Sequence, residues 1–174
     1  PLEFIGSDTE GFGDMGIGAR ARVWENDETS AALRMFTKIP TASTKLGFSR
    51  QLDLFTSGIV THELDEHTAA TGYYELGILG DENGGSADLQ HLMALAVSSS
   101  VAEEVSLFGE FAGIVNAPAG DPLFLLIGLS RAVSPSFVFD GGVRVGLNND
   151  AEDAVFLLGL TNNFGYVSDP EAFE

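Results

Sequence analysis

The side chains of this chain most able to do chemistry are charged groups spaced two or four residues apart in strand-like segments. Arg20 and Arg22 form one such pair and alternate with small apolar residues, and the segment 138–147 repeats the pattern around Asp140 and Arg144. Because successive side chains of a strand point to opposite faces, this spacing places the charges on one face and the apolar residues on the other. Charged groups arranged in this way can line a polar passage or a small-ligand site.

A sheet with one charged and one hydrophobic face is typical of a barrel whose outside contacts lipid and whose inside contacts water. The mixture of acids and bases predicts an internal ladder of ion pairs, because charges removed from bulk water need partners. Such a ladder either braces a narrow barrel or guides a solute, and both interpretations stay open. The predicted lumen-facing and solute-facing residues are Arg20, Arg22, Arg34, Lys38, Glu75, Glu110, Asp140 and Arg144.

Aromatic residues fall on both predicted faces. One group shares the polar face and could contact an aromatic solute, and the other faces outward, where it fits an interfacial girdle. The first group contains Trp24, Phe36, Tyr73 and Phe108, and the second contains Tyr74, Phe111, Phe137 and Phe139.

Period-two alternation predicts nine strands, each long enough to cross a hydrocarbon layer when tilted, which takes about 9–11 residues. The segment 87–101 is the only one that also resembles a helix. Short and long connections alternate along the chain, as in up-and-down outer-membrane barrels, whose longer loops are extracellular. The strands are expected at about 13–24, 30–39, 50–61, 67–79, 88–99, 104–114, 122–133, 137–147 and 153–166.

An odd strand number departs from bacterial barrels, which have an even number with both termini in the periplasm. Either Pro1–Gly6 contributes part of a further strand, or one or more N-terminal strands are missing, and we favour the second interpretation. The chain begins at Pro1 without an initiating Met, so we also expect a processed form from which a signal peptide has been removed.

Composition narrows the class of partner. The formal net charge of −18 over 174 residues argues against nucleic acid, whose phosphates need a cationic surface. Most acids fall in the expected turns, where they keep a hydrophobic protein soluble, bind divalent cations or repel anions at a pore mouth. No spacing of the EF-hand type supports the cation interpretation. The chain lacks Cys and has no uninterrupted apolar stretch of the length that a spanning helix needs.

Two motifs have the wrong context for the chemistry they suggest. Gly11–Gly16 matches G-x-G-x-x-G, but an alternating strand follows where a dinucleotide site needs a helix. His62–His67 resembles a zinc-protease motif, but its histidines are five residues apart and would not share a helix face. We therefore expect no enzyme activity, no cofactor and no metal site, although a loose surface metal site at the second motif stays open.

Several segments resemble an outer-membrane barrel family named for the meta-pathway of phenol degradation. The segment GFGDMGIGARARVW (11–24) resembles the strand opening of this family. The segment MFTKIPTAS (35–43) resembles its strand with a Pro-Thr-Gly turn, although Ala42 replaces the expected Gly. Its Glu-bearing strand and its last hairpin resemble GEFAGI (109–114) and FDGGVRVGLNNDAEDAVFLLGLTNNF (139–164). The resemblance implies an outer-membrane location and the passage of small, often aromatic or hydrophobic, compounds. It assigns no binding residue. The missing N-terminal strands and the strong acidity depart from the family.

The sequence therefore predicts a single all-β domain over residues 1–174, an antiparallel up-and-down transmembrane-type β-barrel with 9–10 visible strands, lacking N-terminal strands. The expected function is passive passage of small solutes across the bacterial outer membrane, with outer-membrane lipid as surroundings and no nucleic acid as partner. One alternative is a secreted or surface-assembled β protein that self-associates into filaments or coats through strand edges. Another is a soluble lipocalin-like ligand binder with apolar residues inside.

Overall fold

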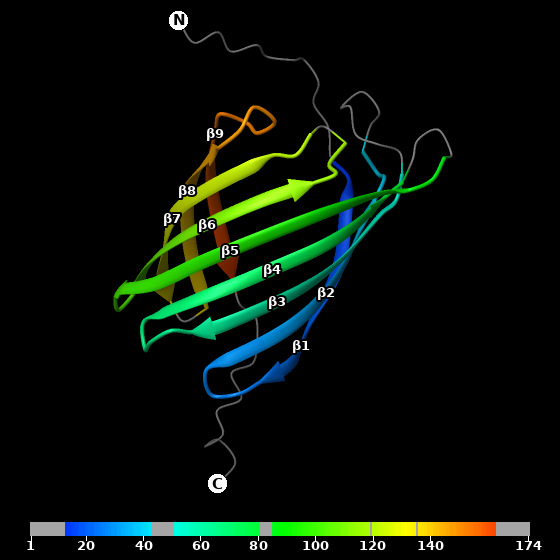
Figure 1. Ribbon diagram of the computed structural model, residues 1–174. Helices are drawn as coiled ribbons and strands as arrows, with labels where there is room; N and C mark the ends of the chain where they lie inside the picture. Colours follow the sequence, from blue (N-terminus) through cyan, green and yellow to red (C-terminus); the bar gives the residue numbers. More distant parts are fainter. Residues whose placement is uncertain (1–12, 43–50, 81–84, 119, 135, 163–174) are drawn as a thin grey trace, which may run out of the picture.

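The structure is a computed structural model that describes residues 13–42, 51–80, 85–118, 120–134 and 136–162. These residues form nine strands and no helix (Figure 1). The strands are β1 (Met15–Glu25), β2 (Thr29–Ile39), β3 (Asp53–Glu63), β4 (Thr68–Leu79), β5 (Asp88–Ala102), β6 (Val105–Val115), β7 (Leu123–Ser134), β8 (Phe137–Gly146) and β9 (Ala154–Asn162).

All nine strands belong to one antiparallel sheet in which each strand pairs with its neighbours in sequence. The predicted strands are therefore present, with ends shifted by a few residues, and the segment with the helical alternative is the strand β5. Residues 163–166 of the last predicted strand and the N-terminal segment Pro1–Gly6 lie outside the described residues.

The connections separate by length between the two ends of the sheet, as expected. The short turns 26–28, 64–67, 103–104 and 135–136 join strands at one end, and the longer connections 40–52, 80–87, 116–122 and 147–153 join them at the other. Both β1 and β9 run from the long-loop end towards the short-turn end (Figure 1).

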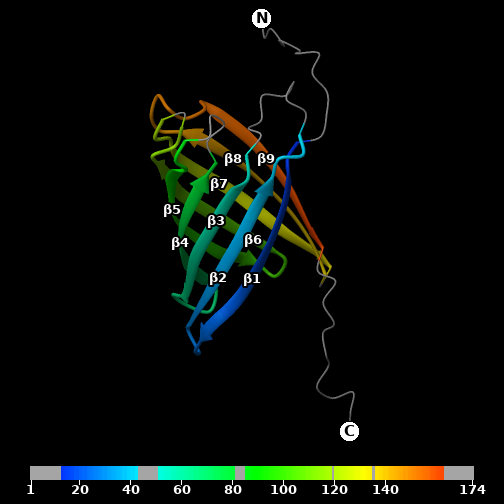
Figure 2. The same cartoon turned by 90° about the vertical axis from the view of Figure 1, so that its right-hand side faces the viewer.

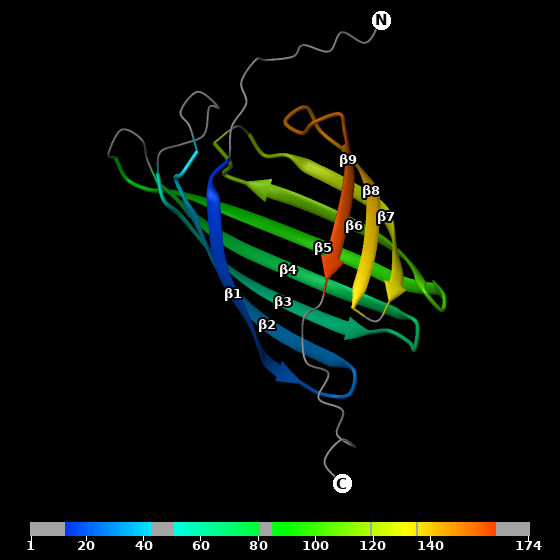
Figure 3. The same ribbon diagram turned by 180° about the vertical axis from the view of Figure 1, so that it is seen from behind.

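The sheet curls, and its two edge strands come to the same side of the molecule. Figure 3 shows both β1 and β9 on the near side of the curled sheet, and Figure 2 agrees. Among the described residues no backbone ladder joins β1 to β9. The sheet is thus a strongly curved, open meander.

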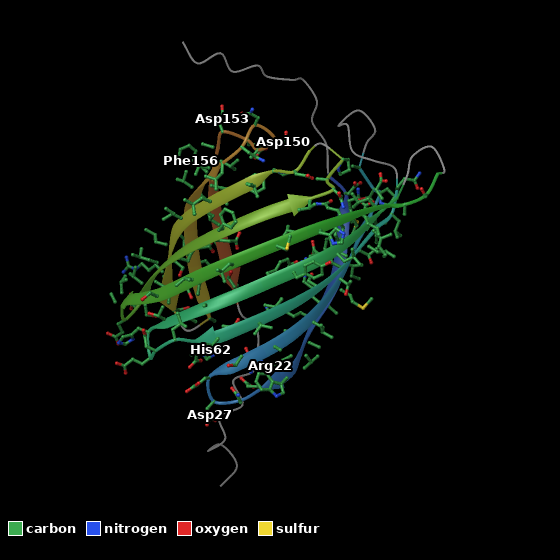
Figure 4. All side chains as sticks on the ribbon, in the orientation of Figure 1. Arg22, Asp27, His62, Asp150, Asp153 and Phe156 are labelled. Atoms are coloured by element: carbon green, nitrogen blue, oxygen red, sulfur yellow. The ribbon has the colours of Figure 1, made fainter. Side chains whose placement is uncertain are left out.

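The two faces of the sheet differ sharply in chemistry. The curled sheet surrounds a hollow. We call the face of the sheet that lines this hollow the inner face, and the opposite face the outer face. Large apolar side chains project from the outer face into the surroundings, for example Met35 at 71%, Leu158 at 81% and Phe156 at 82% exposure (Figure 4). A soluble monomer rarely exposes an apolar surface that continues over a whole sheet. The lipocalin-like alternative requires the reverse polarity.

Little of the chain forms a dry core. Among the described residues the buried hydrophobic side chains are Ala32, Ile59 and Ala112, and Asp53 and Ser57 are buried beside them on the inner face. The described residues contain no helix that is long and apolar enough to span a membrane.

The alternation breaks at three bulges in the described ladders, all of them next to short turns. In β1 the register shifts between Arg22 and Trp24, so that Trp24 pairs with Ala31 and Glu25 with Ser30. A bulge adds one residue to one strand and exchanges the faces of the residues that follow it. Trp24 therefore lies on the outer face, and its predicted place on the polar face is wrong.

The other aromatic residues lie where the alternation places them. Phe36 and Tyr73 line the hollow, and Phe108 lies across from Gly128 on the same face. The predicted outward group, which pairs in register with outer-face residues, is Tyr74, Phe111, Phe137 and Phe139.

Candidate solute site on the inner face

The inner face encloses an open cavity of about 750 Å³ to which strands β1 to β8 contribute side chains. Its charged groups are Arg20, Arg34, Glu110 and Arg144. Between them lie aromatic, aliphatic and small side chains: Phe36, Ile59, Thr71, Tyr73, Leu92, Ala94, Ala96, Ala112, Ile114 and Phe124. A mostly apolar hollow with a few convergent polar groups is the usual form of a small-molecule site.

Strand register explains why these charges meet. Arg20 lies directly opposite Arg34, Arg34 opposite Ser57, and Ser57 opposite Glu75. Paired residues of an antiparallel sheet share a face, so this row crosses four strands on the inner face. By the same ladders Arg22 and Lys38 belong to this face, as do Glu110, Asp140 and Arg144. All eight predicted residues thus share one face, while their role in a lumen stays a prediction.

Glu75 is the centre of the best-connected polar group on that face. Its Oε2 accepts hydrogen bonds from Tyr73 (2.5 Å), Ser57 (2.7 Å) and Arg34 (3.3 Å), with its side chain 13% exposed. The guanidinium of Arg34 also lies 4.9 Å from the centre of the Phe36 ring. This group holds Arg34 in place and neutralises its charge.

Lys38 joins the strand ends near the long loops. Its Nζ lies 2.5 Å from an Asp53 carboxylate oxygen and 3.6 Å from one of Asp14. The other oxygens of these acids accept the backbone N–H groups of Gly80 (3.0 Å) and Ala42 (2.9 Å). Lys38 and its two acids therefore brace this end of the sheet.

The remaining charges differ in their partners. Arg144 binds Glu152 at 2.9 Å and lies 4.5 Å from the centre of the Phe124 ring, and Arg22 binds Glu25 at 2.5 Å. The side chains of the second pair are more than half exposed, so solvent screens their attraction and the pair adds little to stability. The acids that pair with the predicted cations (Asp14, Glu25, Asp53 and Glu152) were not identified from sequence, since pairing depends on register and loop paths.

Within the described residues, three of the predicted charges form no ion pair: Arg20, Glu110 and Asp140. A Cβ built on Gly159 would lie 2.2 Å from an Asp140 oxygen, so the glycine leaves room for that carboxylate. Arg20 and Glu110 both line the cavity. They are the charges left available for a solute.

Further charged groups lie at the two ends of the sheet. Arg22, Asp27 and His62 lie at the short-turn end, and Asp150 and Asp153 lie at the long-loop end (Figure 4). His62 bonds Thr29 at 2.8 Å, and the carboxylate of Asp65 accepts the backbone N–H of His67 at 2.8 Å, which lowers the pKa of Asp65. The segment His62–His67 is thus a strand end and hairpin turn, and no group of potential metal ligands occurs among the described residues.

Comparison with models of known protein families and with curated proteins found no match.

Proposed function

We propose that this protein is an outer-membrane β-barrel channel through which small solutes diffuse. The supporting observation is the polarity of the sheet. Exposed aliphatic and aromatic side chains cover the outer face, while the inner face carries charges around a cavity of about 750 Å³. Lipid is the solvent that suits such an outer face, and water suits the inner one. The sequence resemblance described above agrees with this proposal.

The proposed barrel needs a closed sheet, because an open edge in lipid leaves backbone N–H and C=O groups without partners. The curl that brings β1 and β9 to one side of the molecule favours closure (Figure 3). The regular division into short turns and longer loops also fits a barrel that crosses a membrane.

Current through a planar bilayer tests the proposal. The full chain, refolded in detergent, is expected to give discrete conductance steps, and heat-denatured protein is the control. Replacing Arg20 and Arg22 by Ala should shift the ion preference towards cations, because two positive charges leave the inner face. Absence of steps from folded protein would overturn the channel, and unchanged ion preference would remove these arginines from the passage.

One observation favours a second candidate, assembly through strand edges. All eleven residues of β1 are exposed. Within the described part of the chain, the edge of β1 that faces away from β2 has no strand partner. Such an edge can template another strand. Size measurement in detergent and in detergent-free buffer separates the two candidates: a channel needs detergent, whereas an assembling protein stays soluble without it and grows into polymers.

A further inference from the structure

The cavity contains a positive charge that the fold does not use. Among the described residues, each other cation of the inner face has an acid: Arg22 has Glu25, Arg34 has Glu75, Lys38 has Asp53 and Arg144 has Glu152. Arg20 has no acid partner within the described part of the chain, and it borders both the main cavity and a smaller one beside it.

The place of Arg20 makes this charge costly for folding alone. It lies directly opposite Arg34 in the β1–β2 ladder, and like charges at directly opposed positions destabilise a sheet. Among the described residues, the acid that pairs with Arg34 is Glu75, which also accepts hydrogen bonds from Tyr73 and Ser57. Glu75 therefore neutralises one of the two arginines. One net positive charge remains in this row of paired residues.

The main cavity beside Arg20 is largely apolar, whereas the smaller one also contains Arg22, Ser30 and Thr61. Gly16 and Gly18 precede Arg20 on the same face, and the Phe36 ring lies against both, since Cβ atoms built there would come within 2.2 and 3.0 Å of its atoms. Phe36 in turn contacts Phe55, with ring centres 5.9 Å apart. Ile59 and Leu92 continue the apolar lining of the cavity from β3 and β5.

We infer that this part of the cavity binds small organic carboxylates, with the carboxylate on Arg20 and an aromatic or aliphatic body against Phe36. This inference rests on the proposed function, because it names the solute class of the same passage. A guanidinium presents a planar fork of N–H donors that matches a carboxylate in a two-point contact. Arg34 is not the primary contact, because Glu75 holds it in place and neutralises its charge.

The acidity of the whole chain does not cancel this charge. Arg20 is the central residue of β1, which spans Met15–Glu25, so each strand end lies about 16 Å away at about 3.3 Å per residue. This distance is about twice the Debye length of about 8 Å at physiological ionic strength. Acids in the turns and loops are therefore largely screened from Arg20. Glu110 lines the same cavity, but it belongs to β6, five strands along the sheet from β1, so the positive potential is confined to the Arg20 side of the cavity.

Benzoate is a suitable probe, with phenol as a neutral aromatic control. We expect calorimetric titration of the folded protein in detergent to detect benzoate binding, and Arg20→Gln to weaken it roughly tenfold or more, since a hydrogen-bonded charge pair is lost. Arg131→Gln is the control and should leave it unchanged, because Arg131 lies on the outer face, where it pairs with Glu104. Arg20→Lys should retain part of the affinity.

The outcomes separate this inference from the channel. No benzoate binding, or equal losses for Arg20→Gln and Arg131→Gln, would overturn the carboxylate site even if bilayer currents are normal. Benzoate binding that depends on Arg20 without any current would support the site and overturn the channel. Arg20→Gln should fold at least as well as the parent, because it relieves the contact between like charges, and a denaturant titration checks this.

Discussion

Replacing Leu95 by arginine tests whether lipid covers the outer face. Leu95 is the central residue of β5 and is 58% exposed on that face. In water, a substitution at such an exposed site changes the free energy of unfolding by roughly 0.5 kcal/mol or less. At the midplane of a bilayer, arginine on the lipid face of a barrel destabilises by about 2–4 kcal/mol. The two surroundings therefore predict clearly different results.

A second position, Leu89, tests whether the destabilisation by arginine depends on depth in the membrane. It lies near the start of the same strand and is 51% exposed on the same face. It is six positions from Leu95, which is about 20 Å along the strand and about 15 Å along the membrane normal at a tilt near 40°. Since the apolar band of such barrels is about 25 Å tall, Leu89 should lie at its border, where Leu89→Arg destabilises by about 0–1 kcal/mol.

The assay is unfolding by guanidinium from lipid vesicles, followed by the fluorescence of the single tryptophan, Trp24. Ala96→Arg is the matched control, because Ala96 is adjacent in sequence, lines the cavity and lies directly opposite Glu110. It should be tolerated much better than Leu95→Arg. Equal effects of Leu95→Arg and Leu89→Arg, or a larger effect of Ala96→Arg, would refute the assignment of the outer face to lipid.

Three further predictions concern the inner face and the bulge. Glu75→Gln should lower the free energy of unfolding by about 2 kcal/mol in a denaturant titration, because Arg34 loses its counter-charge, and an unchanged midpoint would contradict the polar group at Glu75. Gly16→Ala should destabilise by about 1–3 kcal/mol, since its Cβ would meet the Phe36 ring, whereas Gly58→Ala, with nothing within 4 Å, should be neutral. Trp24 fluorescence in vesicles should be quenched by brominated lipid rather than by aqueous iodide, and the reverse would place Trp24 on the inner face.

The assignment of faces is predictable from sequence because alternation in a strand is strict. Arg20, Arg34 and Arg144 share a face with Glu110 in the structure, as their positions within the predicted strands require. The same rule fails at Trp24, since one extra residue in β1 exchanges the faces. Nothing in the alternating pattern marks that residue.

The ion-pair and hydrogen-bond partners within the site cannot be predicted from the sequence. The Arg34–Glu75 pair joins residues that lie two strands apart, so it depends on the register of both β2–β3 and β3–β4. Ser57, which donates to Glu75, has no chemical signature in the sequence. The apolar part of the cavity, such as Ile59 and Leu92, arises because bulky residues occasionally replace polar ones on the inner face.

The shared direction of β1 and β9 restricts how this sheet can grow. Copies related by rotation about an axis along the strands would meet β1 against β9, and every such seam would be parallel, whatever the number of copies. A fully antiparallel ring needs an odd number of additional strands at each seam. The direction of the strands at a seam therefore distinguishes ring-shaped oligomers of this sheet, whose seams are parallel, from barrels completed by an inserted strand, whose seams are antiparallel. The backbone hydrogen bonds of one seam would identify the mode of closure.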